Sequence, residues 1–294
     1  MVKKMNLNQI VRQLISDLGD KEREVIVRHF GIGKKERESL ASIGKEWGLS
    51  RERVRQIKDR ALQKLREKVK KATNLFLAID QYFSQNFGVK REDLLIQEWG
   101  GNEIILFLVL SGKYKREKES KEFFAMWIKD KESLERAKNL ISRLIDYFEK
   151  TKKIQKLESL ALELKMEKQA LKSVLEISKI LGQNKEGFWG LRKWPEIYPR
   201  GLKDKAYLVF KKLQKPLHFM ELAKMIPEAK VESLHNELIK DPRFVLVGRG
   251  IYALREWGYI PGEVKDVILQ ILKQKGRPMT KEEILKEIQK QRIV

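Results

Sequence analysis

The sequence LASIGKEWGLSRERVRQIKDRALQKLR, residues 40–66, has the pattern of two helices joined by a tight turn. A helix-turn-helix needs a small residue where the helices approach each other, a glycine in the turn and apolar residues on the inner face of the second helix. Gly44 and Gly48 meet the first two requirements, and Val54 and Ile57 meet the third. The spacing therefore predicts a helix-turn-helix.

The outer side chains of the second helix have the chemistry to contact DNA. In this motif the N-terminal part of that helix enters the major groove, where Arg pairs with guanine, Gln with adenine and Glu accepts from cytosine. Ser50 is a suitable N-cap for the helix. The alternative is a three-helix core with a solvated basic face. We expect base contacts from Arg51, Glu52, Arg55 and Gln56, and phosphate contacts from Ser50, Arg53, Lys58, Arg60, Lys64 and Arg66.

The overall charge favours an anionic partner. Of 294 residues, 63 are Lys or Arg and 41 are Asp or Glu, which gives a net charge of +22. Such an excess attracts DNA phosphates, although an anionic membrane surface would also attract it. There is no apolar run of about 18 residues and no apolar signal core at the N-terminus. We expect a cytoplasmic, nucleoid-associated protein with no membrane partner.

Several residue patterns that carry catalysis in enzymes are missing from the sequence. It contains no cysteine, and His29, His218 and His235 are scattered without metal-ligand spacing. It also contains no glycine-rich phosphate loop. We therefore predict a protein that is not an enzyme and has no cofactor, metal or small-molecule substrate.

The C-terminal half contains a repeat. GFWGLRKW (187–194) matches GIYALREW (250–257), and PLHFMELAKMI (216–226) matches PMTKEEILKEI (278–288). A period of about 60 residues indicates a small repeated domain. Each copy has the order helix, short strand, helix, helix, hairpin, which is a winged helix. At the hairpin tip Arg249 is a candidate phosphate contact, with an ordinary exposed turn residue as the alternative.

The predicted fold class is mainly α, with an N-terminal helix-turn-helix and tandem winged-helix units that carry small β-hairpin wings. The charged run KYKREKESKE (113–122) is interpreted as a solvated linker or loop at a domain boundary, and a helix is predicted at 167–181. The predicted domains are the helix-turn-helix at 1–71, a helical connector at 72–131, a degenerate winged-helix unit at 132–198, a winged helix at 199–261 and a partial third unit at 262–294.

The N-terminal segment resembles region 4 of the bacterial sigma-70 family. The resemblance rests on KEREVIVRHFGI, SLASIGKEWGLS and RERVRQIKDRALQKLR, within residues 18–66. It implies a helix-turn-helix that binds the −35 promoter element and contacts the RNA polymerase flap. It also implies that Arg51, Glu52, Arg55 and Gln56 contact bases or nearby phosphates, with Arg53 and Arg60 in support.

A complete sigma factor carries a further region before region 4, which melts the −10 element and binds polymerase. Only 17 residues precede the resemblance in this sequence, so we expect that the chain does not open promoter DNA by itself.

The repeats resemble the HARE-type winged helix-turn-helix, on KDKAYLVFKKLQKPLHFMELAKMI and LIKDPRFVLVGRGIYALREWGY. The delta subunit of bacterial RNA polymerase shares that domain, as do some chromatin and DNA-modification proteins. The resemblance covers about 200–260 well, 132–194 loosely and 262–294 in part. It implies contact with DNA or with the transcription apparatus.

We predict a sequence-specific, sigma-like transcription factor whose partners are double-stranded promoter-like DNA and the RNA polymerase core. The alternative is a delta-like polymerase accessory protein that acts mainly through protein contacts. A third possibility, a regulatory piece of a DNA-modifying enzyme, is disfavoured because the sequence has no catalytic constellation.

Overall fold

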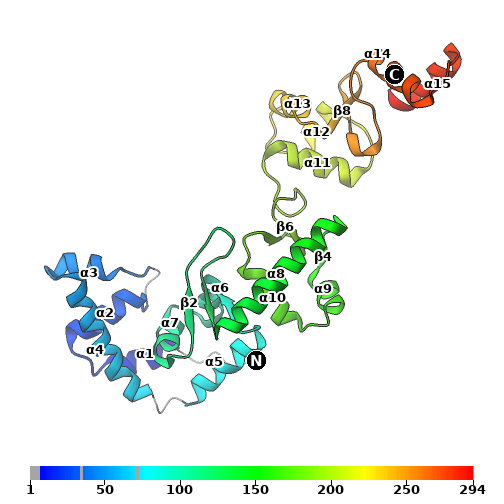
Figure 1. The fold of residues 1–294 in the computed structure, drawn as a ribbon. Helices are drawn as coiled ribbons and strands as arrows, with labels where there is room; N and C mark the ends of the chain where they lie inside the picture. Colours follow the sequence, from blue (N-terminus) through cyan, green and yellow to red (C-terminus); the bar gives the residue numbers. More distant parts are fainter. Residues whose placement is uncertain (1–6, 34–35, 70–72, 294) are drawn as a thin grey trace. The chain divides into compact units, whose positions relative to one another are not determined.

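The computed structural model describes residues 7–33, 36–69 and 73–293, and the chain divides into two compact parts, Met1–Leu191 and Arg192–Val294. Figure 1 shows helices throughout, with small sheets between them. The predicted mainly helical fold with hairpin wings is confirmed. The predicted domain boundary at residue 71 lies outside the described residues.

The N-terminal helices end where the sequence supplies caps. Gly31 adopts a left-handed conformation (φ 67°) at the end of the second helix, and the Ser42 backbone N–H donates to the Ser39 hydroxyl over 3.1 Å at the start of the third. These are the expected signals for helix ends. The helices are α1 (Leu7–Ile15), α2 (Asp20–Phe30), α3 (Leu40–Trp47) and α4 (Arg51–Val69).

Residues 73–128 form a complete winged helix, which we call the first winged module. It has three helices and a three-stranded antiparallel sheet in the order β1-β3-β2. Its elements are α5 (Thr73–Gln85), β1 (Val89–Arg91), α6 (Glu92–Trp99), α7 (Glu103–Ser111), β2 (Lys115–Glu117) and β3 (Met126–Ile128). The prediction of a helical connector at 72–131 is therefore wrong. Each strand has only three residues, too few for an alternating pattern to be visible in the sequence.

The predicted domain boundary at 113–122 is also wrong. The run is exposed over most of its length, as expected, but Lys115 and Glu117 pair with Ile128 and Met126 in a β-hairpin. A solvated hairpin tip and a linker have the same charged composition. Only the pairing of the flanking strands distinguishes them.

The same element order repeats twice, in the second (131–191) and third (201–254) winged modules. In each, the first strand pairs with the last strand, which also pairs with the middle one. The second consists of α8 (Lys131–Thr151), β4 (Gln155–Lys156), α9 (Leu157–Glu163), α10 (Lys168–Ile177), β5 (Leu181–Gln183) and β6 (Phe188–Leu191). The third consists of α11 (Gly201–Leu213), β7 (Leu217–His218), α12 (Phe219–Lys224), α13 (Val231–Lys240), β8 (Phe244–Gly248) and β9 (Ile251–Leu254).

Two details differ from the sequence predictions or extend them. The helix predicted at 167–181 ends at Ile177, because Leu181 begins strand β5. After the third module come the short 3₁₀ helix η1 (Arg255–Trp257) and the helices α14 (Val264–Lys275) and α15 (Lys281–Gln291). The Ile293 N–H donates to the Val247 carbonyl over 2.7 Å, which joins the end of α15 to the third module.

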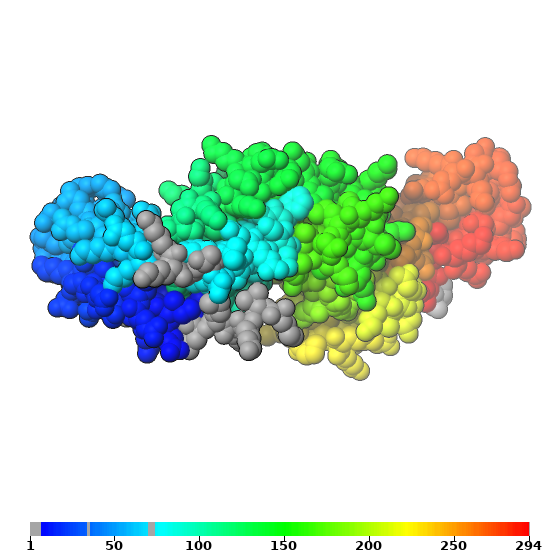
Figure 2. Space-filling model, turned by 90° about the horizontal axis from the view of Figure 1, so that it is seen from below, coloured from blue at the N-terminus to red at the C-terminus, as the bar shows by residue number. Residues whose placement is uncertain are grey.

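Helix α7 is buried almost all round. Ile104, Leu106, Phe107 and Leu108 are fully inaccessible, and they share one hydrophobic core with residues of α1, α2 and α4. Figure 2 shows the N-terminal helices, in blue, against the cyan and green first winged module. Within the described residues no single helix is long and apolar enough to cross a membrane, and only α6 and α7 together, bent by 110°, pass that test.

Helix α10 is likewise buried against the first winged module. The fully buried Lys90 ammonium on β1 lies 2.9 Å from the Glu176 carboxylate on α10. The Ser173 hydroxyl donates to the Val89 carbonyl over 2.5 Å. The third helices of the first and second winged modules, α7 and α10, therefore pack against the module that precedes each of them.

Candidate nucleic-acid interface

The turn between α3 and α4 requires glycine at two positions. A Cβ atom on Gly44 would lie 2.6 Å from the Leu49 carbonyl oxygen, so any side chain there would force the helices apart. Gly48 is left-handed (φ 65°), and the Leu49 N–H donates to the Gly44 carbonyl over 2.8 Å. The predicted helix-turn-helix is confirmed at these residues.

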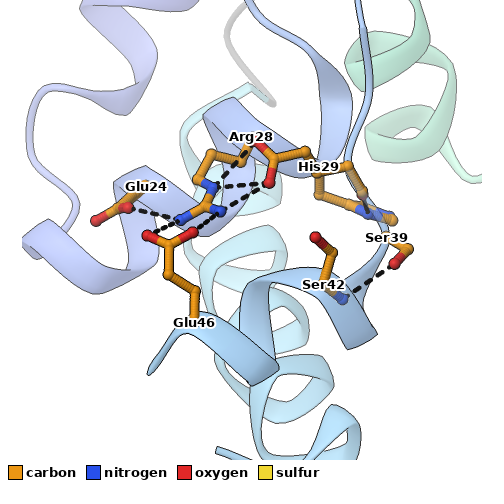
Figure 3. A network of polar contacts seen from close by, with 7 residues as sticks. Glu24, Arg28, His29, Ser39, Ser42 and Glu46 are labelled. Atoms are coloured by element: carbon orange, nitrogen blue, oxygen red, sulfur yellow. Dashed lines mark hydrogen bonds and ion pairs between the residues drawn. The ribbon is translucent and has the colours of Figure 1, made fainter. Parts of the chain in front are cut away.

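A buried arginine holds α3 against α2 (Figure 3). Arg28 contacts three carboxylates, at 3.1 Å from Glu24, 2.7 Å from Glu38 and 2.5 Å from Glu46. The hydrogen bonds that Arg28 donates to the Glu38 and Glu46 carboxylates raise the pKa of Arg28. No sequence pattern points to this role of Arg28, because Glu38 and Glu46 lie 10 and 18 positions away from it in the chain.

His29 is partly buried beside this network. Its Nδ1 lies 3.1 Å from the Glu38 carbonyl, and burial lowers the pKa of the ring despite that hydrogen bond. Among the described residues, no group of three or more His, Asp or Glu side chains is placed to hold a metal ion.

The two faces of α4 divide as the sequence predicted. Val54 is fully buried with Val25 and Ile43, and Trp47 and Ile57 pack against this small core. The four predicted base contacts are all exposed in the first two turns of the helix: Arg51, Glu52, Arg55 and Gln56.

Arg55 is held by carboxylates on its own helix. Its guanidinium lies 2.6 Å from Glu52 and 2.7 Å from Asp59. Arg53 donates to the Gln56 side-chain oxygen over 3.0 Å. These exposed contacts contribute little to stability, so they can be exchanged for contacts to a ligand at low cost. The outer face of α4 is thus ordered, and its side chains remain available to contact a ligand.

The predicted phosphate contacts of α4 fall into two groups, and the first consists of Ser50, Arg53, Lys58 and Arg60. The Arg53 backbone N–H donates to the Ser50 hydroxyl, Lys58 lies 3.2 Å from Asp59, and Arg60 is exposed.

Two of the predicted phosphate contacts are exposed and also contact other parts of the protein. Lys64 lies 2.8 Å from Glu22 on α2, and Arg66 donates to the Val109 carbonyl on α7 over 3.5 Å. Both stand near the C-terminal end of α4, where α2 and α7 pack. The structure thus places Ser50, Arg53, Lys58 and Arg60 near the four predicted base contacts, and Arg249 at the β8–β9 hairpin tip in the other compact part.

Glu92 fixes the loop before α3 to the first winged module. It is 6% exposed and lies 2.5 Å from Arg37 and 2.5 Å from Arg116, while the Trp127 indole donates to it over 2.8 Å. Burial acts to raise the pKa of Glu92, but the hydrogen bonds from Arg116 and Arg37 outweigh it and hold the pKa at about 2. No sequence pattern points to Glu92 either, because its partners Arg37 and Arg116 are 55 and 24 positions away.

The N-terminal segment is similar to a known protein family. Residues 14–67 match the family described as Sigma-70, region 4. The chain is 46% identical over 67 residues to the RNA polymerase sigma-C factor of Nostoc sp., and 38% over 66 residues to the RNA polymerase sigma factor RpoS of Coxiella burnetii. It is 44% identical over 66 residues to the chloroplastic RNA polymerase sigma factor sigF of Arabidopsis thaliana.

These matches define a domain and not the whole chain. They cover 23%, 22% and 22% of this chain and 16%, 19% and 12% of the three relatives. Residues 14–67 are a sigma-70 region 4 domain. The resemblance of the C-terminal modules to HARE-type domains and to the delta subunit is not supported by these comparisons and stays a prediction.

Proposed function

We propose that this protein is a sequence-specific DNA-binding transcription factor, sigma-like, which acts at promoter DNA together with the RNA polymerase core. One observation carries the proposal. Within a sigma-70 region 4 domain, the first two turns of α4 expose two arginines, a glutamate and a glutamine on one face. These are the side chains that distinguish base pairs in the major groove.

The electrostatics of the face support the proposal. Val54 and the glycines of the turn fix the helix from inside, so the outer side chains need no rearrangement of the backbone to contact a groove. The net charge of +22 supplies the salt-dependent attraction on which specific contacts are superimposed. We propose that Ser50, Arg53, Lys58 and Arg60 contact phosphates beside the bases.

The test is selection of preferred duplexes by the purified protein, followed by binding measurements on the selected and on random DNA. Arg55→Ala and Gln56→Ala should each weaken binding to the selected site by about 1–3 kcal/mol and leave binding to random DNA nearly unchanged. Arg12→Ala, at an exposed arginine of α1, is the matched control. Equal losses on both duplexes would contradict base recognition by α4.

A second candidate is a polymerase accessory protein that acts through protein contacts. The observation in its favour is the burial of α7 and of most of α10, which leaves little of the third helices of the first and second winged modules free to contact DNA. Retention of the chain on core polymerase without DNA, unaffected by Arg55→Ala, would support this role. Retention that requires promoter DNA would contradict it.

A further inference from the structure

The second and third winged modules carry the same basic corner, at the end of their first helix. In the second module Lys150 lies in the last turn of α8 and Lys153 follows the helix. In the third module Lys212 and Lys215 occupy the equivalent positions around α11. We call each pair of lysines a basic corner.

The correspondence is structural as well as sequential. Each helix ends on a non-glycine residue in the left-handed conformation, Lys152 (φ 53°) in the second module and Gln214 (φ 52°) in the third. One lysine lies two residues before that residue, and the other follows it directly. Equivalent backbone geometry thus presents the two lysines of each module in the same way.

The wing tip of each module lies at the other end of the short first strand from the corner. Lys156 pairs with Phe188 beside the tip of one wing, and His218 pairs with Ile251 beside the tip of the other. The wing tips carry one exposed cation each, Lys185 and Arg249 respectively. Each module therefore presents exposed cations at two separate places, the corner and the wing tip.

These cations are not used to stabilise the fold. In the part of the chain that the structure describes, no carboxylate lies within ion-pair distance of the four corner lysines or of the wing-tip cations. The corner lysines are all exposed: Lys150, Lys153, Lys212 and Lys215.

The first winged module provides an internal comparison. Its first helix, α5, has no basic residue in its last turn, yet Phe87 soon after it is left-handed (φ 59°) as in the other modules. Asn86 at this corner is 1% exposed and accepts a 2.9 Å hydrogen bond from Gln169 on α10. A helix end with this backbone geometry therefore does not require lysines. In the first winged module, where α10 covers the helix end, there are none at these positions.

We infer that the basic corners of the second and third winged modules bind the phosphate backbone of duplex DNA outside the site contacted by α4. Lysine ammonium groups on flexible stems suit phosphates and carry no base specificity. Phosphate binding at the corners also leaves α7 and α10 in their buried positions. The inference rests on the proposed function, since it supposes a DNA already engaged by α4.

The experiment compares the full-length chain with the variant Lys150→Gln/Lys153→Gln/Lys212→Gln/Lys215→Gln. Binding is measured on a selected site in a duplex of about 12 base pairs, one helical turn, and in one of about 40 base pairs. The wild type should bind the long duplex more tightly. The variant should lose about tenfold or more on the long duplex, with a salt slope smaller by about 3, and should bind the short duplex like the wild type.

The control carries the same loss of charge at exposed lysines elsewhere, Lys129→Gln/Lys131→Gln/Lys203→Gln/Lys281→Gln. This control variant should still bind the long duplex more tightly than the short one, as the wild type does. Equal losses of affinity in the two quadruple variants would contradict DNA binding by the basic corners. A corner variant that kept the wild-type dependence on duplex length and the wild-type salt slope would contradict it as well. If the wild type bound neither duplex, the proposed function would fail and the corners with it.

Discussion

Arg28 and Arg55 have opposite roles although both contact several carboxylates. Arg28 is 9% exposed and joins α2, α3 and the loop between them, so its charge is committed to the fold. Arg55 contacts Glu52 and Asp59 on its own helix, and all three are accessible to solvent. Burial, and not the number of partners, separates a structural arginine from a candidate reader of DNA.

At this scale Gly44 offers a sharp test of the turn. Gly44→Ala should destabilise the protein by about 2 kcal/mol, because the new Cβ would lie 2.6 Å from the Leu49 carbonyl oxygen. Chemical denaturation measures the change. Gly19→Ala, where the nearest atom would be 3.8 Å away, is the control and should change stability little. Equal effects of the two substitutions would show that α3 and α4 do not approach as closely as described.

At the scale of elements, α7 explains why the N-terminal helices and the first winged module form one folding unit. A helix that is apolar on every side must be covered on every side. α6 and the sheet belong to its own module, while α1, α2 and α4 cover the remaining faces. The side chains that would face a groove in a DNA-binding winged helix are therefore core residues here.

Glu92 gives this junction a pH dependence. Its folded pKa of about 2 lies below the ordinary 4.5, so its stabilisation is complete above pH 4.5 and is lost as the pH falls towards 2. Relative to Glu92→Gln, the wild type should be more stable by about 3 kcal/mol at pH 7 and by almost nothing near pH 2. Urea denaturation across that range measures the difference.

The control for this titration is Glu67→Gln, at an exposed carboxylate of α4. The difference in unfolding free energy between the wild type and this variant should not shrink comparably as the pH falls. A wild-type advantage over Glu92→Gln that stayed constant from pH 7 to pH 2 would mean that the carboxylate is not held by its arginines.

At the scale of the whole molecule, the boundaries of stable fragments should follow the shared core and not the sequence repeats. A fragment of residues 1–72 lacks Ile104, Phe107 and Leu108, which complete its core, whereas 1–191 contains one whole compact part. Thermal unfolding followed by circular dichroism should give a cooperative transition for 1–191 and a weaker, broader one at lower temperature for 1–72. Equal midpoints would contradict a shared core.

The sequence alone determined the helix-turn-helix and the later repeats. Gly44, Gly48 and Val54 act over a few residues, so their spacing was sufficient to define the turn and the inner face of α4. The hairpin around Arg249 was visible for the same reason, since both strands and the turn lie within one short stretch.

Only the tertiary structure decided how the modules use their helices. The first winged module was invisible because its strands are three residues long and its wing is charged like a linker. Lys64 and Arg66 resemble their neighbours in sequence, yet Lys64 contacts α2 and Arg66 contacts α7. The contacts of Arg28 and Glu92, and the burial of α7 and α10, join residues far apart in the chain. Periodicity reports which face of a helix is apolar, but what covers that face depends on long-range packing.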